Sequence, residues 1–173
     1  MRTPPQLPPA IAAWVEADRL LELPAMEAQL SPGVVLRSPL TDAFVFRGPR
    51  DVAQVFGAAF DLLRDIEIAA VTGSGDDWVV HGVNTLGGRN LEEIQWLRLG
   101  ADGLIAEVTL FIRPVPAVIG LFARIGARLA ARGVLPRRAG VAAGSLAPFA
   151  ALFGGIERFL MPRLGPVGRP DLG

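Results

Sequence analysis

Three side chains in this sequence are candidates for proton transfer near neutral pH, namely Glu93, Asp42 and His81. Glu93 is the sharpest candidate for catalysis, because an apolar cavity raises the pKa of a carboxyl group and suits it to act as an acid or a base. The alternative is that Glu93 lies near a cavity mouth, solvated or paired with an arginine. Asp42 could act as a catalytic base if its loop folds toward such a cavity, although an aspartate in a short connection is more typical of a turn.

His81 is the one histidine, and the sequence has no cysteine. Successive side chains of a strand point to opposite faces, which turns His81 away from the predicted cavity. We therefore expect it at the surface or in a dimer contact rather than in catalysis. One histidine and no cysteine leave only carboxylates to gather around a metal ion. We therefore expect no metal site and no other cofactor.

The first half of the chain predicts helices followed by short strands. Residues 1–9 are rich in proline and predict an extended arm. Apolar residues recur at helical spacing from Ala10 to Met26, with a break at Pro24. Val34 to Pro39 predicts an edge strand ended by proline, and Phe44 to Phe46 a second short strand. The next amphipathic helix is predicted over Asp51 to Leu63.

Four longer strands follow, separated by turns that contain glycine. They are predicted at Ile66–Thr72, Trp78–Leu86, Leu91–Leu99 and Leu104–Ile112. Their spacing is typical of an antiparallel meander, with a hairpin turn at Gly87-Gly88. Segregated helices and strands indicate the α+β class.

The order of these elements resembles the SnoaL-like and ketosteroid-isomerase-like family of the nuclear-transport-factor-like (cystatin-like) fold. The resemblance rests on the helix pair followed by SPGVVLRSP, on the FRG turn before a helix, and on DGLIAEVTLFIRP at the end of the meander. It implies a curved antiparallel sheet wrapped around N-terminal helices, forming a cone with an apolar cavity over residues 10–114. It also implies a homodimer, and members that include isomerases, polyketide cyclases, epoxide hydrolases and binding domains.

The family's isomerases use a tyrosine, a general-base aspartate and a protonated aspartate. The resemblance places the corresponding positions of this sequence at Trp14, Ser38 and Gln95, in that order. All three are replaced, so the resemblance does not predict the standard isomerisation mechanism. A lone serine hydroxyl is too weak a base to take over from an aspartate. If Gln95 faces the cavity, strand alternation brings Glu93 and further residues to the same lining. The predicted ligand-binding residues are Trp14, Ser38, Asn84, Gln95, Leu97, Val108, Leu110 and Ile112.

The opposite face of the sheet is predicted to carry Trp78, Trp96 and Phe111, an apolar surface that suits burial in a homodimer. Arg113 is interpreted as a structural residue that pairs with Glu107 on that face. Thus the two faces of one sheet are expected to serve a ligand and a second copy of the chain.

The charge of the chain divides at the end of the predicted pocket domain. Residues 1–113 carry nine Arg and fifteen Asp or Glu, whereas residues 114–173 carry eight Arg and two acids. The overall net charge of +0 argues against a nucleic-acid-binding protein. Residues 115–173 are predicted as an apolar, Arg-rich helical extension. It either packs on the acidic domain, lids the cavity or swaps to a partner, or it lies on an anionic membrane surface.

Three functions remain open at this point. The first is a protein that binds a small apolar ligand related to polyketides, terpenes or steroids, without the family's standard catalysis. The second is a divergent isomerase, cyclase or epoxide hydrolase that uses Glu93 or Asp42. The third is a membrane-peripheral or interaction protein that acts through residues 115–173. The start of the chain lacks the long apolar run of a secretory signal, so a cytoplasmic location is expected, with membrane-peripheral attachment as the variant.

Overall fold

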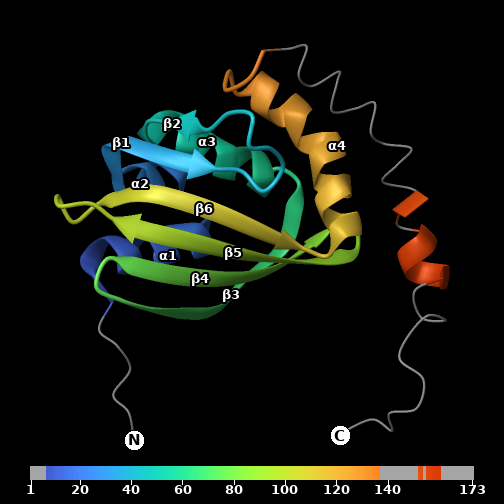
Figure 1. The fold of residues 1–173 in the computed structure, drawn as a ribbon, viewed down its shortest axis with the longest axis horizontal. Helices are drawn as coiled ribbons and strands as arrows, with labels where there is room; N and C mark the ends of the chain where they lie inside the picture. The colour runs from blue at the N-terminus through green and yellow to red at the C-terminus, as the bar shows by residue number, and fades with distance from the viewer. Residues whose placement is uncertain (1–6, 137–151, 154, 161–173) are drawn as a thin grey trace, which may run out of the picture.

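The structure is a computed structural model, and it describes residues 7–136, 152–153 and 155–160. Three helices, α1 (Pro9–Leu20), α2 (Leu23–Glu27) and α3 (Pro49–Phe60), lie on one face of a curved sheet (Figure 1). The helix α4 (Val115–Ala131) follows the last strand and lies beside α3 at one end of the sheet. The α+β class and the helix-filled cone are therefore confirmed.

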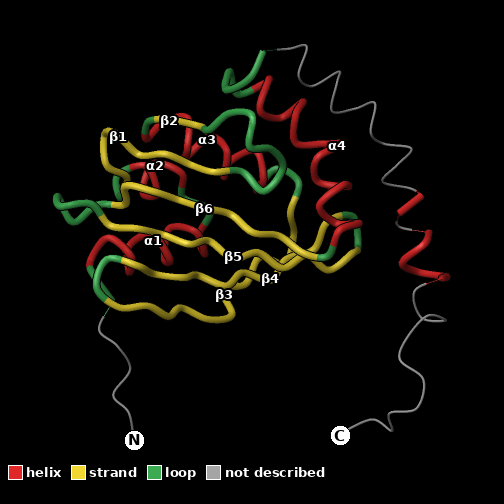
Figure 2. The backbone as a smooth tube through the Cα atoms, viewed as in Figure 1, coloured by secondary structure: helices red, strands yellow, loops and turns green. Residues whose placement is uncertain are grey.

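The sheet has six strands in the order β2-β1-β6-β5-β4-β3. Their bounds are β1 Leu30–Arg37, β2 Phe46–Arg47, β3 Leu63–Ser74, β4 Asp77–Leu86, β5 Arg89–Leu99 and β6 Ile105–Arg113. The long strands β3 to β6 form the predicted antiparallel meander, which Figure 2 shows as one continuous curved layer. The turn between β4 and β5 has positive φ at both Gly87 and Gly88, the conformation that favours glycine in a tight hairpin.

The prediction of an edge strand at residues 34–39 is wrong. The strand β1 pairs antiparallel with β2 on one side and parallel with β6 on the other, so it lies inside the sheet. Pro39 is no obstacle to this position, because β1 ends before it at Arg37. The second short strand is also shorter than predicted, since only Phe46 and Arg47 pair with β1.

Proline and glycine define the ends of the helices that cover the sheet. The helix α3 begins at Pro49 after Gly48, which has a φ of 85°, and Asp51 places a carboxylate in its first turn. The predicted break between two helices is confirmed, but it lies at residues 21–22, and Pro24 stands in the first turn of α2. Because α1 and α3 pack their apolar sides on the sheet, the hydrophobic core lies between these helices and the concave face.

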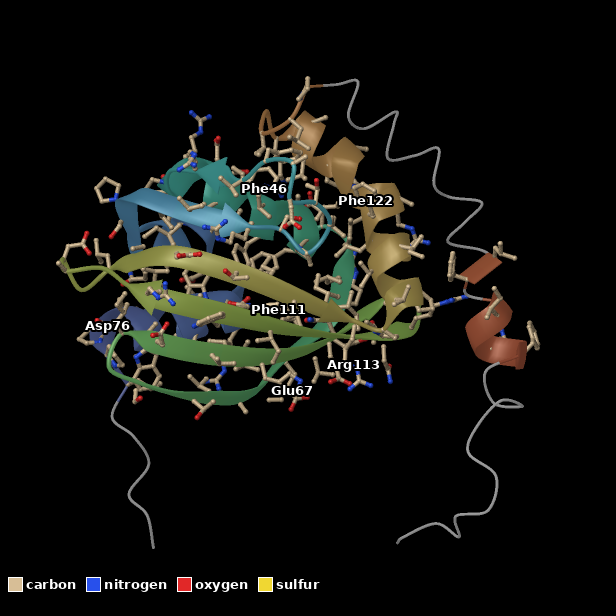
Figure 3. All side chains as sticks on the ribbon, in the orientation of Figure 1. Phe46, Glu67, Asp76, Phe111, Arg113 and Phe122 are labelled. Carbon is tan, nitrogen blue, oxygen red and sulfur yellow. The ribbon has the colours of Figure 1, made fainter. Side chains whose placement is uncertain are left out.

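The two faces of the sheet differ in burial as strand alternation predicts. Val80, Asn84, Gln95, Leu97 and Val108 are all buried on the concave face. On the convex face, Trp96 is 40% exposed and Phe111 is 52% exposed. Figure 3 shows Phe111 and Arg113 on the side of the sheet turned away from α1, α2 and α3.

Two predictions for the convex face are wrong. Trp78 is only 3% exposed, because it lies on the same face as Val80 and its Nε1 donates a hydrogen bond to the Gly75 carbonyl at 2.9 Å. Arg113 pairs with Glu92 at 3.8 Å and not with Glu107. The homodimer through this face stays a prediction.

The extension begins with a helix as predicted, and α4 spans Val115–Ala131. The second predicted helix, over residues 145–160, lies largely outside the described residues; within the described part, Ile156–Leu160 form a π-helical turn. In the part of the chain that the structure describes, no helix is long and apolar enough to cross a membrane.

Candidate functional site

An apolar cavity of about 360 Å³ lies between the sheet, α3, α4 and the loop over residues 38–46. This volume falls within the range of small-molecule sites. The strands β5 and β6 and the helices α3 and α4 line it with aliphatic and aromatic side chains, and Figure 3 labels two of the lining residues, Phe46 on β2 and Phe122 on α4. Ser38, Thr41 and Glu93 are the polar residues among the described lining.

The helix α4 forms one wall of the cavity, which makes the extension part of the site. It contributes Leu121, Phe122, Ile125, Gly126 and Leu129. These positions recur at three and four residues, the spacing that places side chains on one face of a helix. Of the arrangements predicted for the extension, packing on the domain and lidding the cavity are those that α4 adopts.

The far end of α4 is fixed to α3 by the Arg132 side chain. Its guanidinium donates to both carboxylate oxygens of Asp61, at 3.1 and 2.9 Å, and to Gln54 Oε1 at 2.8 Å. Gly57 on α3 provides the room, since a Cβ atom there would lie 2.5 Å from Arg132 Nη1. A planar guanidinium held by two acceptors in this way has a defined direction, so it positions the end of the cavity wall.

The floor of the cavity carries a chain of buried polar groups centred on Gln95. Trp14 Nε1 donates to Gln95 Oε1 at 2.8 Å. Gln95 Nε2 donates to Asp18 Oδ2 at 2.8 Å and to Glu93 Oε1 at 3.1 Å. Two carboxyl groups, one on α1 and one on β5, therefore meet at a single amide.

Both carboxyl groups are neutral over a wider pH range than usual. The pKa of Glu93 is raised to about 7: burial raises it most, the negative charge of Asp18 also raises it, and the hydrogen bond from Gln95 and the nearby amide of Asn84 lower it. Burial also raises the pKa of Asp18 to about 6, against the hydrogen bond from Gln95. Glu93 keeps some accessible surface because its side chain lines the cavity, whereas Asp18 is 1% exposed.

Asn84 lies beside Glu93 on the neighbouring strand. It is 1% exposed, and neither atom of its side-chain amide has a hydrogen-bond partner of ordinary geometry among the described residues. Its amide is nevertheless close enough to favour the charged form of Glu93. Gly82, opposite Glu93 on β4, leaves the space that the carboxyl group occupies, since a Cβ atom there would lie 3.0 Å from Glu93 Oε1.

The predicted ligand-binding residues separate into two groups. Ser38, Leu110 and Ile112 line the cavity together with Glu93. The others are buried in the floor or core beneath the lining, namely Trp14, Asn84, Gln95, Leu97 and Val108. Direct contact of this second group with a ligand stays a prediction, and their position supports a role behind the cavity surface.

The remaining proton-transfer candidates lie away from the cavity. Asp42 is exposed on the loop, and it is absent from the described lining although its neighbours Leu40 and Thr41 belong to it. His81 lies on the convex face, as predicted, with Nε2 3.5 Å from Glu92 Oε2. Among the described residues, no three His, Cys, Asp or Glu side chains come together as metal ligands would.

Sequence reasoning missed Asp18, and it left the position of the extension open among several arrangements, of which a lid on the cavity was one. Asp18 follows Trp14 by four residues, so both lie on the apolar face of α1. An acid on the buried face of a helix was the signal that could have found it. The apolar face of α4 was visible in the sequence as a helical pattern, but the surface on which it packs was not.

No family model matches the sequence. No curated protein matches it either. Comparison of the structures, in contrast, finds clear similarity. A steroid delta-isomerase from Pseudomonas aeruginosa superposes with a TM-score of 0.68 and 22% identity, over 78% of this chain and 100% of that chain.

The chain has the fold of the SnoaL-like and ketosteroid-isomerase-like proteins. An uncharacterised protein with a cystatin-like fold from Silicibacter pomeroyi gives a TM-score of 0.66 at 22% identity, over 76% of this chain and 90% of that chain. A polyketide cyclase candidate from Sinorhizobium meliloti gives 0.51 at 18% identity, over 61% of this chain and 95% of that chain. At these identities the SnoaL-like similarity establishes the fold, and the chemistry must be argued from the residues of this cavity.

Proposed function

We propose that this protein binds a neutral, largely apolar small molecule in the cavity, with Glu93 as its polar anchor. The observation that carries the proposal is the cavity itself, about 360 Å³ in volume and apolar apart from Ser38, Thr41 and Glu93 among its described lining. Such a lining takes up hydrocarbon and offers few polar groups to fix its orientation. The names of the structural neighbours, a steroid delta-isomerase and a polyketide cyclase candidate, support polycyclic or polyketide-like ligands.

A binding measurement with two adjacent substitutions tests this proposal. We would titrate the neutral fluorophore N-phenyl-1-naphthylamine into the protein and displace it with progesterone as a rigid apolar ketone. Gly126→Leu introduces a side chain into the described lining, and we expect it to lower the affinity for the fluorophore at least about tenfold by filling the cavity. Ala127→Leu, at the next and exposed position of α4, is the matched control.

The two variants give a clear decision. Equal affinity of Gly126→Leu and Ala127→Leu for the fluorophore would contradict binding in this cavity. Circular dichroism of both variants shows whether α4 keeps its helix, so loss of fold is not mistaken for loss of binding.

A second function is favoured by the pKa of Glu93, which burial raises to about 7. A general acid or base works best when its pKa is close to the working pH. We propose as the alternative that Glu93 removes a proton from the carbon between the carbonyl and the double bond of a β,γ-unsaturated ketone and returns it to the γ carbon of the resulting dienolate, which moves the double bond into conjugation. This would be an isomerisation that does not use Trp14, Ser38 or Gln95 in the family's standard roles.

Deuterium exchange separates binding from this alternative. In D₂O, proton transfer would introduce deuterium at the carbon next to the carbonyl of a bound ketone, and mass spectrometry would detect it. Glu93→Gln should abolish the exchange, whereas Glu92→Gln, on the other face of the same strand, should leave it unchanged. Exchange that survives in Glu93→Gln would contradict the role of Glu93 in proton transfer, and absence of exchange in the wild type would leave only the binding function.

A further inference from the structure

The second buried carboxyl group, Asp18, has no role in the functions proposed above. It lies on α1, is 1% exposed, and does not line the described part of the cavity. A carboxyl group is almost never fully buried without a partner, because its charge is costly to remove from water. Among the described residues, the group that hydrogen-bonds to its carboxylate is the neutral amide of Gln95, at 2.8 Å, and no cation forms an ion pair with it.

The direction of the Gln95 amide is fixed by Trp14. An indole N–H can only donate, so the acceptor 2.8 Å from Trp14 Nε1 must be the oxygen of the amide. The amide nitrogen then faces the two carboxyl groups and offers one hydrogen to each, at 2.8 Å to Asp18 and 3.1 Å to Glu93. Gln95 is thus a rigid connection between a carboxyl group in the core and a carboxyl group in the cavity wall.

The surroundings of the pair contain no compensating charge among the described residues. The α3 and α4 residues that line the cavity near Glu93 are apolar. On β4, Gly82 and Asn84 face Glu93, while His81 points to the convex face and contacts Glu92. The titratable group that acts on Glu93 is therefore Asp18, whose negative charge disfavours a second negative charge nearby.

We propose that Asp18 is a positioning residue that holds Glu93 through the Gln95 amide and keeps a proton on Glu93 once Asp18 itself is charged. This inference rests on the proposed function of Glu93 as the polar anchor of the cavity. A protonated Glu93 donates a hydrogen bond, so the cavity selects neutral ligands with an acceptor oxygen, such as ketones and esters, over carboxylate ligands of the same shape. Glu93 Oε1 is occupied by Gln95, which leaves Oε2 to carry the proton toward the ligand.

The two carboxyl groups lose their protons in sequence. Burial raises the pKa of both groups, to about 6 for Asp18 and about 7 for Glu93, and a charge on either one disfavours a charge on the other. The repulsion between the two charges is mutual, so it falls on the group that ionises last. The pair therefore passes through a state with one proton, and once Asp18 carries the charge that proton is on Glu93, where a ligand can use it.

The test is a carboxyl titration in the ligand-free protein. The side-chain ¹³C carboxyl resonance of Glu93, assigned by its loss in Glu93→Gln, would be followed against pH in the wild type and in Asp18→Asn. The asparagine side chain of this variant keeps an oxygen that can accept from Gln95, while it removes the charge and replaces the other carboxylate oxygen by an amide nitrogen. We expect the midpoint of Glu93 to fall by about one pH unit toward its ordinary value.

Two further variants complete the design. Glu16→Gln removes an exposed charge from the same helix and should not move the Glu93 midpoint. Asp18→Ala also removes the acceptor, so the side-chain amide resonances of Gln95 should shift and broaden. A Glu93 midpoint that stays in place in Asp18→Asn, or that moves equally in Glu16→Gln, would overturn the inference.

The outcome is separable from that of the proposed function. The titration needs no ligand, so a lowered midpoint in Asp18→Asn supports the role of Asp18 even if no apolar molecule binds. Conversely, if the fluorophore binds but the Glu93 midpoint is unchanged in Asp18→Asn, the result would support binding in the cavity and contradict the role of Asp18.

Discussion

Glu92 and Glu93 are adjacent in β5, yet they experience opposite environments. Glu92 lies on the convex face near a histidine and an arginine, with His81 at 3.5 Å and Arg113 at 3.8 Å. Glu93 lies on the concave face, where its neighbours are an amide, a second acid and apolar side chains. Strand alternation alone separates them, because successive side chains point to opposite faces.

The same contrast extends to the two faces as a whole. On the convex face, Arg98 Nε lies 3.1 Å from Asp77 Oδ1 and Arg37 Nε lies 2.7 Å from Glu107 Oε1. Hydrogen bonds from Arg98 and Trp96 lower the pKa of Asp77. On the concave face, burial raises the pKa of Glu93 and Asp18. The convex face thus stabilises charge in water, and the concave face holds a carboxyl group that prefers to stay neutral.

The largest effect is expected from Glu93→Gln compared with Glu92→Gln. A raised pKa means that native Glu93 keeps its proton after the unfolded chain has lost it, between about pH 4.5 and 7. Stability therefore falls as pH rises through this window, by about 3 kcal/mol in total for this group. Glu93→Gln should remove this loss, so it should be more stable than the wild type at pH 8 and similar to it at pH 4.

Urea unfolding at both pH values measures this difference, with Glu92→Gln expected to stay within about 0.5 kcal/mol of the wild type. If the stability difference between Glu93→Gln and the wild type is the same at pH 8 as at pH 4, then Glu93 is solvated. This result would contradict the difference between Glu92 and Glu93.

The second effect compares two tryptophans that each donate to a side-chain acceptor. Trp14 is 0% exposed and donates to Gln95, whereas Trp96 is 40% exposed and donates to Asp77 at 3.0 Å. Trp14→Phe leaves the Gln95 oxygen unpaired and creates a cavity, which should destabilise the fold by about 2–3 kcal/mol. Trp96→Phe should cost less than about 1 kcal/mol. Similar values from chemical unfolding of the two variants would mean that the Trp14 bond contributes no more than a surface contact.

The third effect concerns the wall of the cavity. Arg132→Ala breaks the bonds to Asp61 and Gln54 and should cost about 1 kcal/mol, because the two-point pairing of the guanidinium with a carboxylate and the bond to Gln54 are lost together. Arg128→Ala, at an exposed position of the same helix, is the control and should cost about 0.5 kcal/mol or less. Faster release of the bound fluorophore by Arg132→Ala alone, measured by stopped flow, would show that this anchor holds the wall in place. Identical release from both variants would contradict that role.

The smallest effect is expected on the convex face. The lowered pKa of Asp77 contributes stability above its ordinary value of 3.8, and this contribution is lost as pH falls below it. Arg98→Gln should weaken this dependence slightly, and added salt should reduce the difference from the wild type. Acid unfolding at low and high salt measures it. An effect as large as that of Arg132→Ala would contradict the view that water screens this face.

Much of this contrast could be predicted from the sequence, because it depends on strand alternation. Placing Gln95 inward predicted the burial of Asn84, Leu97 and Val108, and it also placed His81 outward. Trp78 was assigned to the wrong face although the same alternation puts it beside Val80. The alternation, applied to Trp78 as it was to His81, gives the concave face on which the structure places it.

The parts that sequence could not supply depend on contacts between distant elements. No periodicity distinguishes the parallel pairing of β1 with β6 from an edge position, because both look like a short apolar strand. Asp18 meets Glu93 only through Gln95, which is 77 residues away from it in the chain. The position of α4 against the cavity depends on the packing of its apolar face and on the ion pair between Arg132 and Asp61. The sequence offers many other pairings of an arginine with an acid, so it did not indicate this one.

One measurement tests the central claim most directly, a ¹³C carboxyl titration of the wild-type protein in which Glu93 and Asp77 are followed together. We predict a midpoint of about 7 for Glu93 and, in the same sample, a midpoint for Asp77 below its ordinary value of 3.8. A Glu93 midpoint near 4.5, the ordinary value for its side chain, would contradict the claim, because it would show a solvated carboxylate where we infer a protonated anchor in an apolar cavity.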